Sequence, residues 1–301
     1  MVKYRIQLRN VQNVAASKTA LIDCPTGQRY HWIGLVHGYA AGTNTIAGAY
    51  ANISEIRVLV NDRVQRTVSG AQLRDKNILN GNSSQMVGAV TAMLSGFDSV
   101  AGQVPNTAPG VVIPIFFGEP WMADEATQDA LAWPTNLWSS MQVQVDLGAA
   151  STPTLAAFAV VDDLTVTKEP SIVKYIRGSI PASGTSFDFT LSERRDLLRA
   201  IHIYQDSGGS NTPSEVDLRK DGKILHELSY AANQGLLVGY QMTPNASGRT
   251  AGIYDLVLDH DGLLVSAVDL SQGTAPTVTV KAASTMSGTT TYILERLGPR
   301  E

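Results

Sequence analysis

The sequence predicts an all-β protein built from two β-sandwich domains in tandem, and a recurring hairpin is the main reason. An alternating stretch that begins at Ser54-Glu55 returns in altered form at Ser214-Glu215, 160 positions later (214 − 54 = 160). Both copies are interrupted by a two-residue turn, Asn61-Asp62 in the first and Asp221-Gly222 in the second. These residues tolerate a positive φ, which the tight turns of β-hairpins require. A hairpin that recurs half a chain apart indicates two copies of one domain.

Length and composition support this organisation. The chain has 301 residues, enough for two domains of about 150 residues each. Charged residues make up 17% of the chain, below the ~25% that is usual for soluble domains, and 26 glycines suit a β-rich protein with many turns. The net charge is −4, and no run of basic residues is longer than two. These values argue against a phosphate-neutralising patch, so we expect no direct nucleic-acid binding.

Alternating or continuous apolar residues predict the strands of the first half. We expect strands at 3–9, 19–24, 29–37, 54–61, 63–68, 111–117, 141–147 and 155–164. Ser69 is placed to cap a short helix over Gly70–Leu79, and a second helix is expected over Met122–Ala132 because acidic residues follow its start. Residues 81–109 are rich in Gly, Ser, Asn, Ala and Pro, which predicts a long loop.

The second half repeats the order of elements. We expect strands at 172–179, 185–191, 198–206, 214–219, 223–228, 253–258, 276–282 and 290–297. Short helices are expected near Tyr230 and over Gly262–Leu270, and Lys168-Glu169-Pro170 is the predicted linker between domains 1–167 and 168–301. About eight strands in each domain fit the jelly-roll layout. The predicted fold class is therefore all-β, with two tandem jelly-roll β-sandwiches (a double jelly roll) and short helices in the connecting loops.

Several segments spread over most of the chain resemble one family. They are Asn10–Ala16, Pro25–Tyr30, Ile56–Val58, Ala200–Ile203 and Lys281–Met286. These residues are similar to the double jelly-roll major capsid proteins of tailless icosahedral phages that enclose a lipid membrane. The chain departs from that pattern at 39–52 and 81–109, which look longer. The lattice type and the outer shape are therefore left open.

The resemblance implies a structural role. It implies two jelly rolls side by side, a homotrimer with a pseudo-hexagonal outline, and a shell tiled by such trimers around an internal lipid membrane. The implied partners are other copies of the chain, neighbouring capsomers, minor and vertex capsid proteins, and the membrane lipid. Residues 1–10 show no apolar core of a signal peptide, so we expect assembly in the host cytoplasm and a final location in the virion.

The first predicted strand carries a basic face. Lys3, Arg5 and Arg9 alternate with apolar residues that point to the other side. Because the resembled family places jelly-roll ends near its membrane, these three residues are candidates for contact with anionic headgroups. Each basic residue near such a surface contributes on the order of 1 kcal/mol. An ordinary solvated strand face is the alternative, and the sequence does not decide between the two.

The sequence predicts no catalytic residue, no cofactor site and no metal site. Neither Gly-x-Ser-x-Gly nor Gly-x-Gly-x-x-Gly occurs, and the five histidines do not form zinc-binding pairs. Asp259-His260-Asp261-Gly262 begins like a calcium loop but lacks the later acidic ligands. The candidate acid pairs for glycoside hydrolysis are Asp162 with Asp163, Glu193 with Asp196, and Asp259 with Asp261.

Two of these acid pairs are weak candidates on local geometry alone. Adjacent residues of a strand point to opposite faces, so Asp162 and Asp163 are not expected to converge. Glu193 and Asp196 lie in a predicted turn, where charged groups are normally solvated. We therefore expect no hydrolytic centre at either place.

The tryptophans and the cysteine favour packing roles. Trp121, Trp133 and Trp138 surround the predicted helix over 122–132 and are expected to pin it or fill a subunit contact, although a carbohydrate-binding face would use the same residue type. A phage spike or lectin-like carbohydrate-binding β-sandwich is thus the alternative function. Cys24 is the chain's one cysteine and is expected to be buried.

Overall fold

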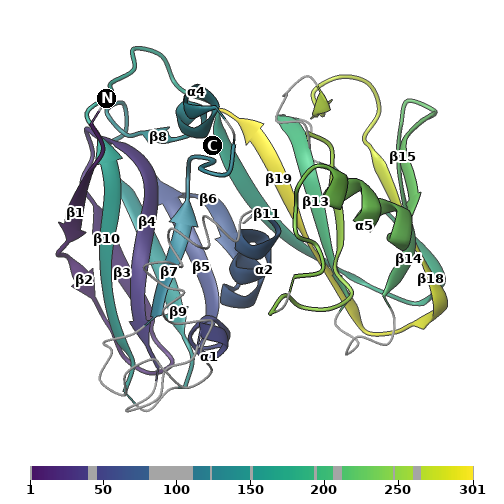
Figure 1. Cartoon of the computed structure of the whole chain (residues 1–301), viewed down its shortest axis with the longest axis horizontal. Coiled ribbons are helices and arrows are strands. Elements are labelled where there is room, and N and C mark those ends of the chain that lie inside the picture. Colours follow the sequence, from purple (N-terminus) through teal and green to yellow (C-terminus); the bar gives the residue numbers. More distant parts are fainter. Residues whose placement is uncertain are drawn as a thin grey trace. The chain divides into compact units, whose positions relative to one another are not determined.

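The computed structural model consists of two compact units (Figure 1). It describes residues 2–39, 46–80, 111–122, 124–149, 152–192, 195–205, 212–246, 248–259 and 266–300. Unit 1 comprises Met1–Ile172 with Pro299–Glu301, and unit 2 comprises Val173–Gly298. The predicted boundary between residues 167 and 168 stays a prediction.

Unit 1 is a sandwich of two antiparallel sheets. One sheet has the strand order β1 (Tyr4–Leu8), β10 (Thr154–Asp162), β4 (Arg29–Gly38) and β7 (Val111–Phe116), with β8 (Trp133–Pro134) also paired to β4. The other has the order β6 (Arg63–Val68), β5 (Ile53–Val60), β9 (Met141–Leu147), β3 (Thr19–Cys24) and β2 (Val11–Gln12). The helices are α1 (Ile46–Ala51), α2 (Gly70–Asn80) and α4 (Glu125–Ala130).

Unit 2 repeats this architecture. One sheet has the order β16 (Tyr254–Val257), β13 (Leu197–Gln205), β19 (Thr289–Gly298) and β11 (Ile172–Pro181), with β17 (Val268–Asp269) also paired to β13. The other has the order β12 (Gly184–Thr190), β18 (Thr277–Met286), β14 (Pro213–Lys220) and β15 (Lys223–Ser229). Helix α5 (Tyr230–Gly239) follows β15 and contacts β14, β15 and β16.

The two units share one strand order, which is that of a jelly roll. When the strands of each unit are matched in chain order, β1-β10-β4-β7 corresponds to β11-β19-β13-β16, and β3-β9-β5-β6 corresponds to β12-β18-β14-β15. The predicted double jelly roll is therefore confirmed. The recurring hairpin seen in the sequence is β5–β6 in unit 1 and β14–β15 in unit 2.

The hairpin turns explain why this part of the repeat is recognisable. Asn61 and Asp62 have φ values of 49° and 63°, and Asp221 and Gly222 have values of 52° and 74°. Two successive residues with positive φ match the right-handed twist of the flanking strands. Few residue types adopt this conformation at low cost, so the turn keeps its chemistry in both copies.

Each of these hairpins leads into a helix that begins at a serine. The Ser69 hydroxyl accepts a hydrogen bond from the Gln72 amide (3.1 Å), and the Gln72 side chain accepts one from the Ser69 amide (2.9 Å). This reciprocal capping box starts α2. In unit 2 the Ser229 hydroxyl accepts from the Ala232 amide (3.3 Å) and starts α5. Both predicted helices are confirmed.

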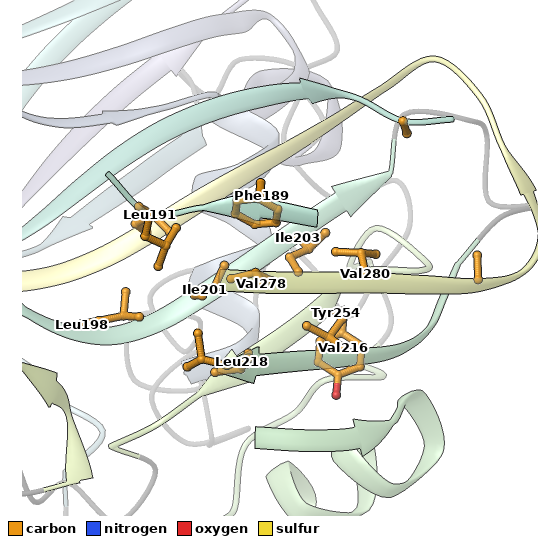
Figure 2. Close-up of a cluster of buried hydrophobic side chains, with 14 of the residues drawn as sticks. Phe189, Leu191, Leu198, Ile201, Ile203, Val216, Leu218, Tyr254, Val278 and Val280 are labelled. Atoms are coloured by element: carbon orange, nitrogen blue, oxygen red, sulfur yellow. The ribbon is translucent and has the colours of Figure 1, made fainter. Parts of the chain in front are cut away.

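The core of unit 2 lies between its two sheets, as Figure 2 shows. Ile201 and Ile203 on β13 face Val278 and Val280 on β18, and all four are fully buried. Alternate residues of each strand supply these side chains, which is why a period of two was readable in the sequence. On the same core, the rings of Phe189 and Tyr292 stack with centroids 4.8 Å apart.

Some sequence-based expectations differ from the structure. The helix expected over Gly262–Leu270 is wrong at its C-terminal end, where Val268 and Asp269 form strand β17 because they pair with Leu198 and Leu197 of β13. The helix expected over 122–132 is shorter, and α1, β2 and β8 were not anticipated. The loop expected over 81–109 lies outside the described residues. None of the described helices is long and apolar enough to cross a bilayer.

Candidate functional site

The N-terminal strand presents its basic residues as predicted. Leu8 is buried and Ile6 is half-buried, whereas Lys3, Arg5 and Arg9 are exposed. Lys3 differs from the other two because its ammonium group lies 2.7 Å from the Asp129 carboxylate. Its charge is therefore already paired, and Arg5 on β1 and Arg9 just after it are the cations that this segment exposes to solvent.

A buried charge cluster fills one end of unit 1. Asp162 is fully buried and accepts hydrogen bonds from Arg29 (2.5 Å) and the Leu164 amide (2.9 Å), and it lies 2.8 Å from His31 Nε2. Burial alone would raise the pKa of Asp162, but these hydrogen bonds outweigh it and bring the pKa to about 2. Asp163 is exposed and accepts a hydrogen bond from the Tyr4 hydroxyl, so the two acids have different partners.

Unit 2 holds a second buried cluster around His202. Its Nδ1 lies 2.7 Å from Asp255 and its Nε2 lies 2.6 Å from Glu295. Arg249 pairs with the same Asp255 at 2.6 Å, and the Asn233 side chain donates to the Asp255 carbonyl at 2.8 Å. The carboxylate of Asp255 is thus paired with His202 and Arg249 of the protein itself. Asp259 is likewise paired with Arg199, and residues 260–265, with the rest of the calcium-like fragment, lie outside the described residues.

Asp196 contradicts the expectation that its turn is solvated. Its side chain is only 1% exposed and pairs with Lys174 at 2.7 Å and with Arg296 at 3.6 Å. Both cations are also buried. Lys174 lies on β11 and Arg296 on β19, so attraction to these two cations keeps the Asp196 carboxylate buried against the sheet. Glu193, the proposed partner of Asp196, lies outside the described residues.

The tryptophans pack as expected. Trp133 is fully buried, and its ring centroid lies 4.5 Å from that of Phe117 and 5.6 Å from that of Trp138. The buried Arg66 guanidinium lies 4.7 Å from the Trp133 ring and 5.0 Å from the Phe117 ring, a cation–π arrangement. Trp121 is half-buried against Phe116. The packing role expected for Trp133 and Trp138 is confirmed, whereas a contact of these tryptophans with the helix or with another subunit stays a prediction.

Sequence reasoning missed one group of acids on the outer hairpin of unit 2. Ligand oxygens of Glu215, Asp217 and Glu227 lie within 4.8 Å of one another. Asp217 and Glu227 are opposite each other in the β14–β15 register, and Glu215 is two residues before Asp217 on the same face. The Lys281 ammonium group lies among them, 3.0 Å from Asp217 and in contact with Glu215. A protein cation therefore already neutralises part of this charge.

A shallow cleft of about 300 Å³ lies at one end of unit 1, lined in part by Asp23, Asp62 and Cys24. Asp23 accepts from the side-chain amides of Gln142 (2.8 Å) and Asn10. Burial raises the pKa of the Cys24 thiol to about 12, so this thiol stays protonated. The cleft thus offers no activated nucleophile among its lining residues.

Large apolar side chains are exposed on the β15–α5 face of unit 2. Ile224 and Leu225 on β15 are 51% and 42% exposed, and Val238 and Tyr240 at the end of α5 are 57% and 41% exposed. Among the described strands, β15 pairs only with β14, so it forms an edge of its sheet. Exposed apolar residues on an edge strand mark an interaction surface, because such edges otherwise aggregate.

Two jelly rolls with one strand order in a single chain form the double jelly-roll fold, which this chain shares with solved viral capsid proteins. Within that class, residues 5–162 match the family described as "Viral coat protein P2 N-terminal domain". The match covers more than half of the chain, so the chain belongs to this family. The resemblance seen in the sequence is therefore confirmed.

Solved structures support the same class. The major capsid protein P2 from bacteriophage PM2 is similar over 100% of this chain and 98% of its own, with a TM-score of 0.77 and 19% identity. The STIV MCP has a TM-score of 0.64 and 14% identity, and the similarity covers 99% of this chain and 96% of its own. PBCV-1 VP54 has a TM-score of 0.67 and 9% identity, and the similarity covers 98% of this chain and 93% of its own. At these identities the likeness concerns the fold alone. A search of curated proteins finds no match.

Proposed function

We propose that the chain is the major capsid subunit of an icosahedral virus, that it trimerises into pseudo-hexagonal capsomers, and that these tile a shell around an internal lipid membrane. The observation that carries the proposal is the shared strand order of the two units. Three chains related by a three-fold axis would present six similar units, so one trimer can occupy a six-sided position. Other capsomers, minor and vertex capsid proteins and lipid would be its partners, with assembly in the host cytoplasm.

The exposed apolar residues of unit 2 support contacts between copies. Ile224 and Leu225 are adjacent in β15, where its pairing with β14 shifts register, and both are exposed. A surface that is buried only on assembly explains why apolar side chains are kept there. The low charge of the chain, 17%, agrees with close packing between neutral surfaces.

The trimer is tested by the mass of the soluble protein. We expect size-exclusion chromatography with light scattering to give three chain masses for the wild type. An Ile224→Asp/Leu225→Asp variant is expected to elute as a monomer, because two charges would have to be buried in the contact. Leu137→Asp, which replaces a residue of 38% exposure in unit 1, is the control. A monomeric wild type at micromolar concentration would contradict the trimer.

Arg5 and Arg9 support contact with membrane lipid. Both are exposed, Arg5 on β1 and Arg9 just after it, whereas Lys3 is paired with Asp129. An anionic bilayer would attract the two arginines by charge alone and would need no specific pocket. We include Lys3 in the proposed membrane-facing set, with the smallest contribution of the three.

Vesicle binding tests this surface. Replacing both Arg5 and Arg9 by glutamine should weaken cosedimentation with phosphatidylserine-containing vesicles about 30-fold, because each charge contributes on the order of 1 kcal/mol. Lys3→Gln should weaken it less. Arg195→Gln, at an exposed position in unit 2, is the control. Equal binding by the double variant and the wild type would remove this face from the proposal.

The carbohydrate-binding alternative loses the tryptophans on which it rested. Stacking on a sugar ring needs an exposed aromatic face. Trp133 and Trp138 are buried, and Trp121 is half-buried against Phe116. The coat-protein family to which the chain belongs is structural, so neither a lectin nor a hydrolase is proposed.

A further inference from the structure

The two units contain the same histidine–carboxylate arrangement at equivalent places. His31 lies on β4 and His202 lies on β13, which correspond in the shared strand order. In unit 1 the acid on the neighbouring strand is Asp162, and it is registered opposite the residue two before His31. In unit 2 the acid is Glu295, registered opposite the residue two before His202. The duplication therefore includes this pair as well as the strands.

The hydrogen bonds of the two histidines differ. Both ring nitrogens of His202 lie at hydrogen-bond distance from carboxylate oxygens, 2.7 Å to Asp255 and 2.6 Å to Glu295. A neutral imidazole has only one N–H, so one of these contacts would bring two lone pairs together. His31 makes one such bond, from Nε2 to Asp162, and its Nδ1 is not aligned to bond Asp129 although it lies 3.0 Å away. A neutral His31 satisfies its geometry.

Protein cations also lie beside the two acids that His31 faces. In unit 1, Arg29 contacts Asp162 (2.5 Å) and Lys3 contacts Asp129 (2.7 Å), so a permanent cation attends each acid that His31 faces. The His31 proton is not needed to pair them.

Around His202 the charged neighbours come from three other elements. Asp255 of β16 and Glu295 of β19 face its two nitrogens, and Arg249, in the segment before β16, pairs with Asp255. The pKa of the Tyr230 hydroxyl on α5 is raised, mainly by burial and in addition by the nearby charge of Asp255. All three members of the His202–Asp255–Glu295 cluster are buried. An acid oxygen facing a neutral ring nitrogen would have no access to water there.

We propose that His202, Asp255 and Glu295 form a proton-binding latch that holds β13, β16 and β19 together, and that the equivalent His31 site has lost this role. The latch is closed while the cluster keeps its proton between the two carboxylates. Strand β16 has only four residues and pairs with β13 alone among the described strands, so it is the element that loss of the proton would free.

The direction of the pH dependence follows from the two environments. Burial alone would lower the pKa of His202, but the hydrogen bonds to Asp255 and Glu295 outweigh it and raise the pKa. The stabilisation by protonated His202 is complete below its pKa in the unfolded chain, about 6.5. It is lost as the pH rises through the pKa of His202 in the folded chain. Burial lowers the pKa of His31, and its acidic partners only partly offset this. Neutral His31 therefore contributes its full stabilisation of the fold above about pH 6.5, and this stabilisation is lost as the pH falls through the folded pKa.

Hydrogen exchange measured by mass spectrometry tests the latch on the full-length chain. After correction for the intrinsic pH dependence of exchange, the opening of β16 should increase above about pH 6.5, by up to tenfold for each pH unit in the window. His202→Gln, which cannot take up a proton, should open more readily at neutral pH and lose this alkaline slope. His31→Gln is the matched control and should keep it. The experiment needs no shell assembly, so its outcome is separate from the proposed function.

A direct titration keeps the proposal testable if His202→Gln does not fold. In the wild type, imidazole chemical shifts measured by NMR should place the midpoint of His202 above about 6.5 and that of His31 below it. A His202 midpoint at or below that value would overturn the latch. An alkaline slope that persists unchanged in His202→Gln would overturn it as well.

Discussion

Replacing Asp196 with asparagine is expected to lower the free energy of unfolding by about 3–5 kcal/mol. The carboxylate is 1% exposed and pairs with two buried cations, Lys174 at 2.7 Å and Arg296 at 3.6 Å. Breaking a buried ion pair is costly because the remaining charges have already lost their water. Asparagine keeps the shape and tolerates the φ of 87° found at this position, so the substitution removes only the charge.

Urea unfolding followed by circular dichroism measures this effect. Asp188→Asn is the matched control, because Asp188 lies exposed on β12 of the same unit and its loss should change stability by no more than about 0.5 kcal/mol. Equal unfolding midpoints for the Asp196 and Asp188 variants would show that the buried ion pairs contribute nothing. A change in the slope of the transition would instead indicate an altered native or unfolded state.

Trp133→Ala is expected to destabilise unit 1 by about 3–5 kcal/mol. The side chain is fully buried and contacts Phe117, Trp138 and the guanidinium of Arg66. Truncation leaves a large cavity and removes one of the two aromatic faces that the buried Arg66 uses. Both losses act in the same direction.

Thermal unfolding of Trp133→Ala and Trp121→Ala separates core packing from a surface role. Trp121 is half-buried, so its truncation should cost clearly less. If Trp121→Ala were as destabilising as Trp133→Ala, the burial difference between them would not control the energetics. Trp133→Phe should recover part of the stability because it restores an aromatic face.

The sequence identified the features that depend on local chemistry. The turns at Asn61-Asp62 and Asp221-Gly222 require positive φ, and the serine cap at Ser69 uses a neighbouring amide, so a short stretch of residues specifies each of them. Strands with one buried face were equally readable, because burial repeats every second residue. The double jelly roll followed from these strands and their repetition.

Features that depend on distant partners could not be predicted. The turn around Asp196 looks solvated in sequence, but cations on β11 and β19 draw the carboxylate inward. Val268 and Asp269 carry no strong strand signal and pair with β13 only because the fold brings them there. The His202 cluster combines residues that are 53 and 93 positions apart, so no spacing rule could reveal it.

The seclusion of Cys24 has a practical consequence for spectroscopy on this protein. The chain's one thiol is 5% exposed and stays protonated at neutral pH, so thiol-directed reagents should leave it unmodified. A cysteine introduced at any exposed position would then be the single reactive site of the molecule. Dyes or spin probes can thus be attached one at a time without first mutating the native residue.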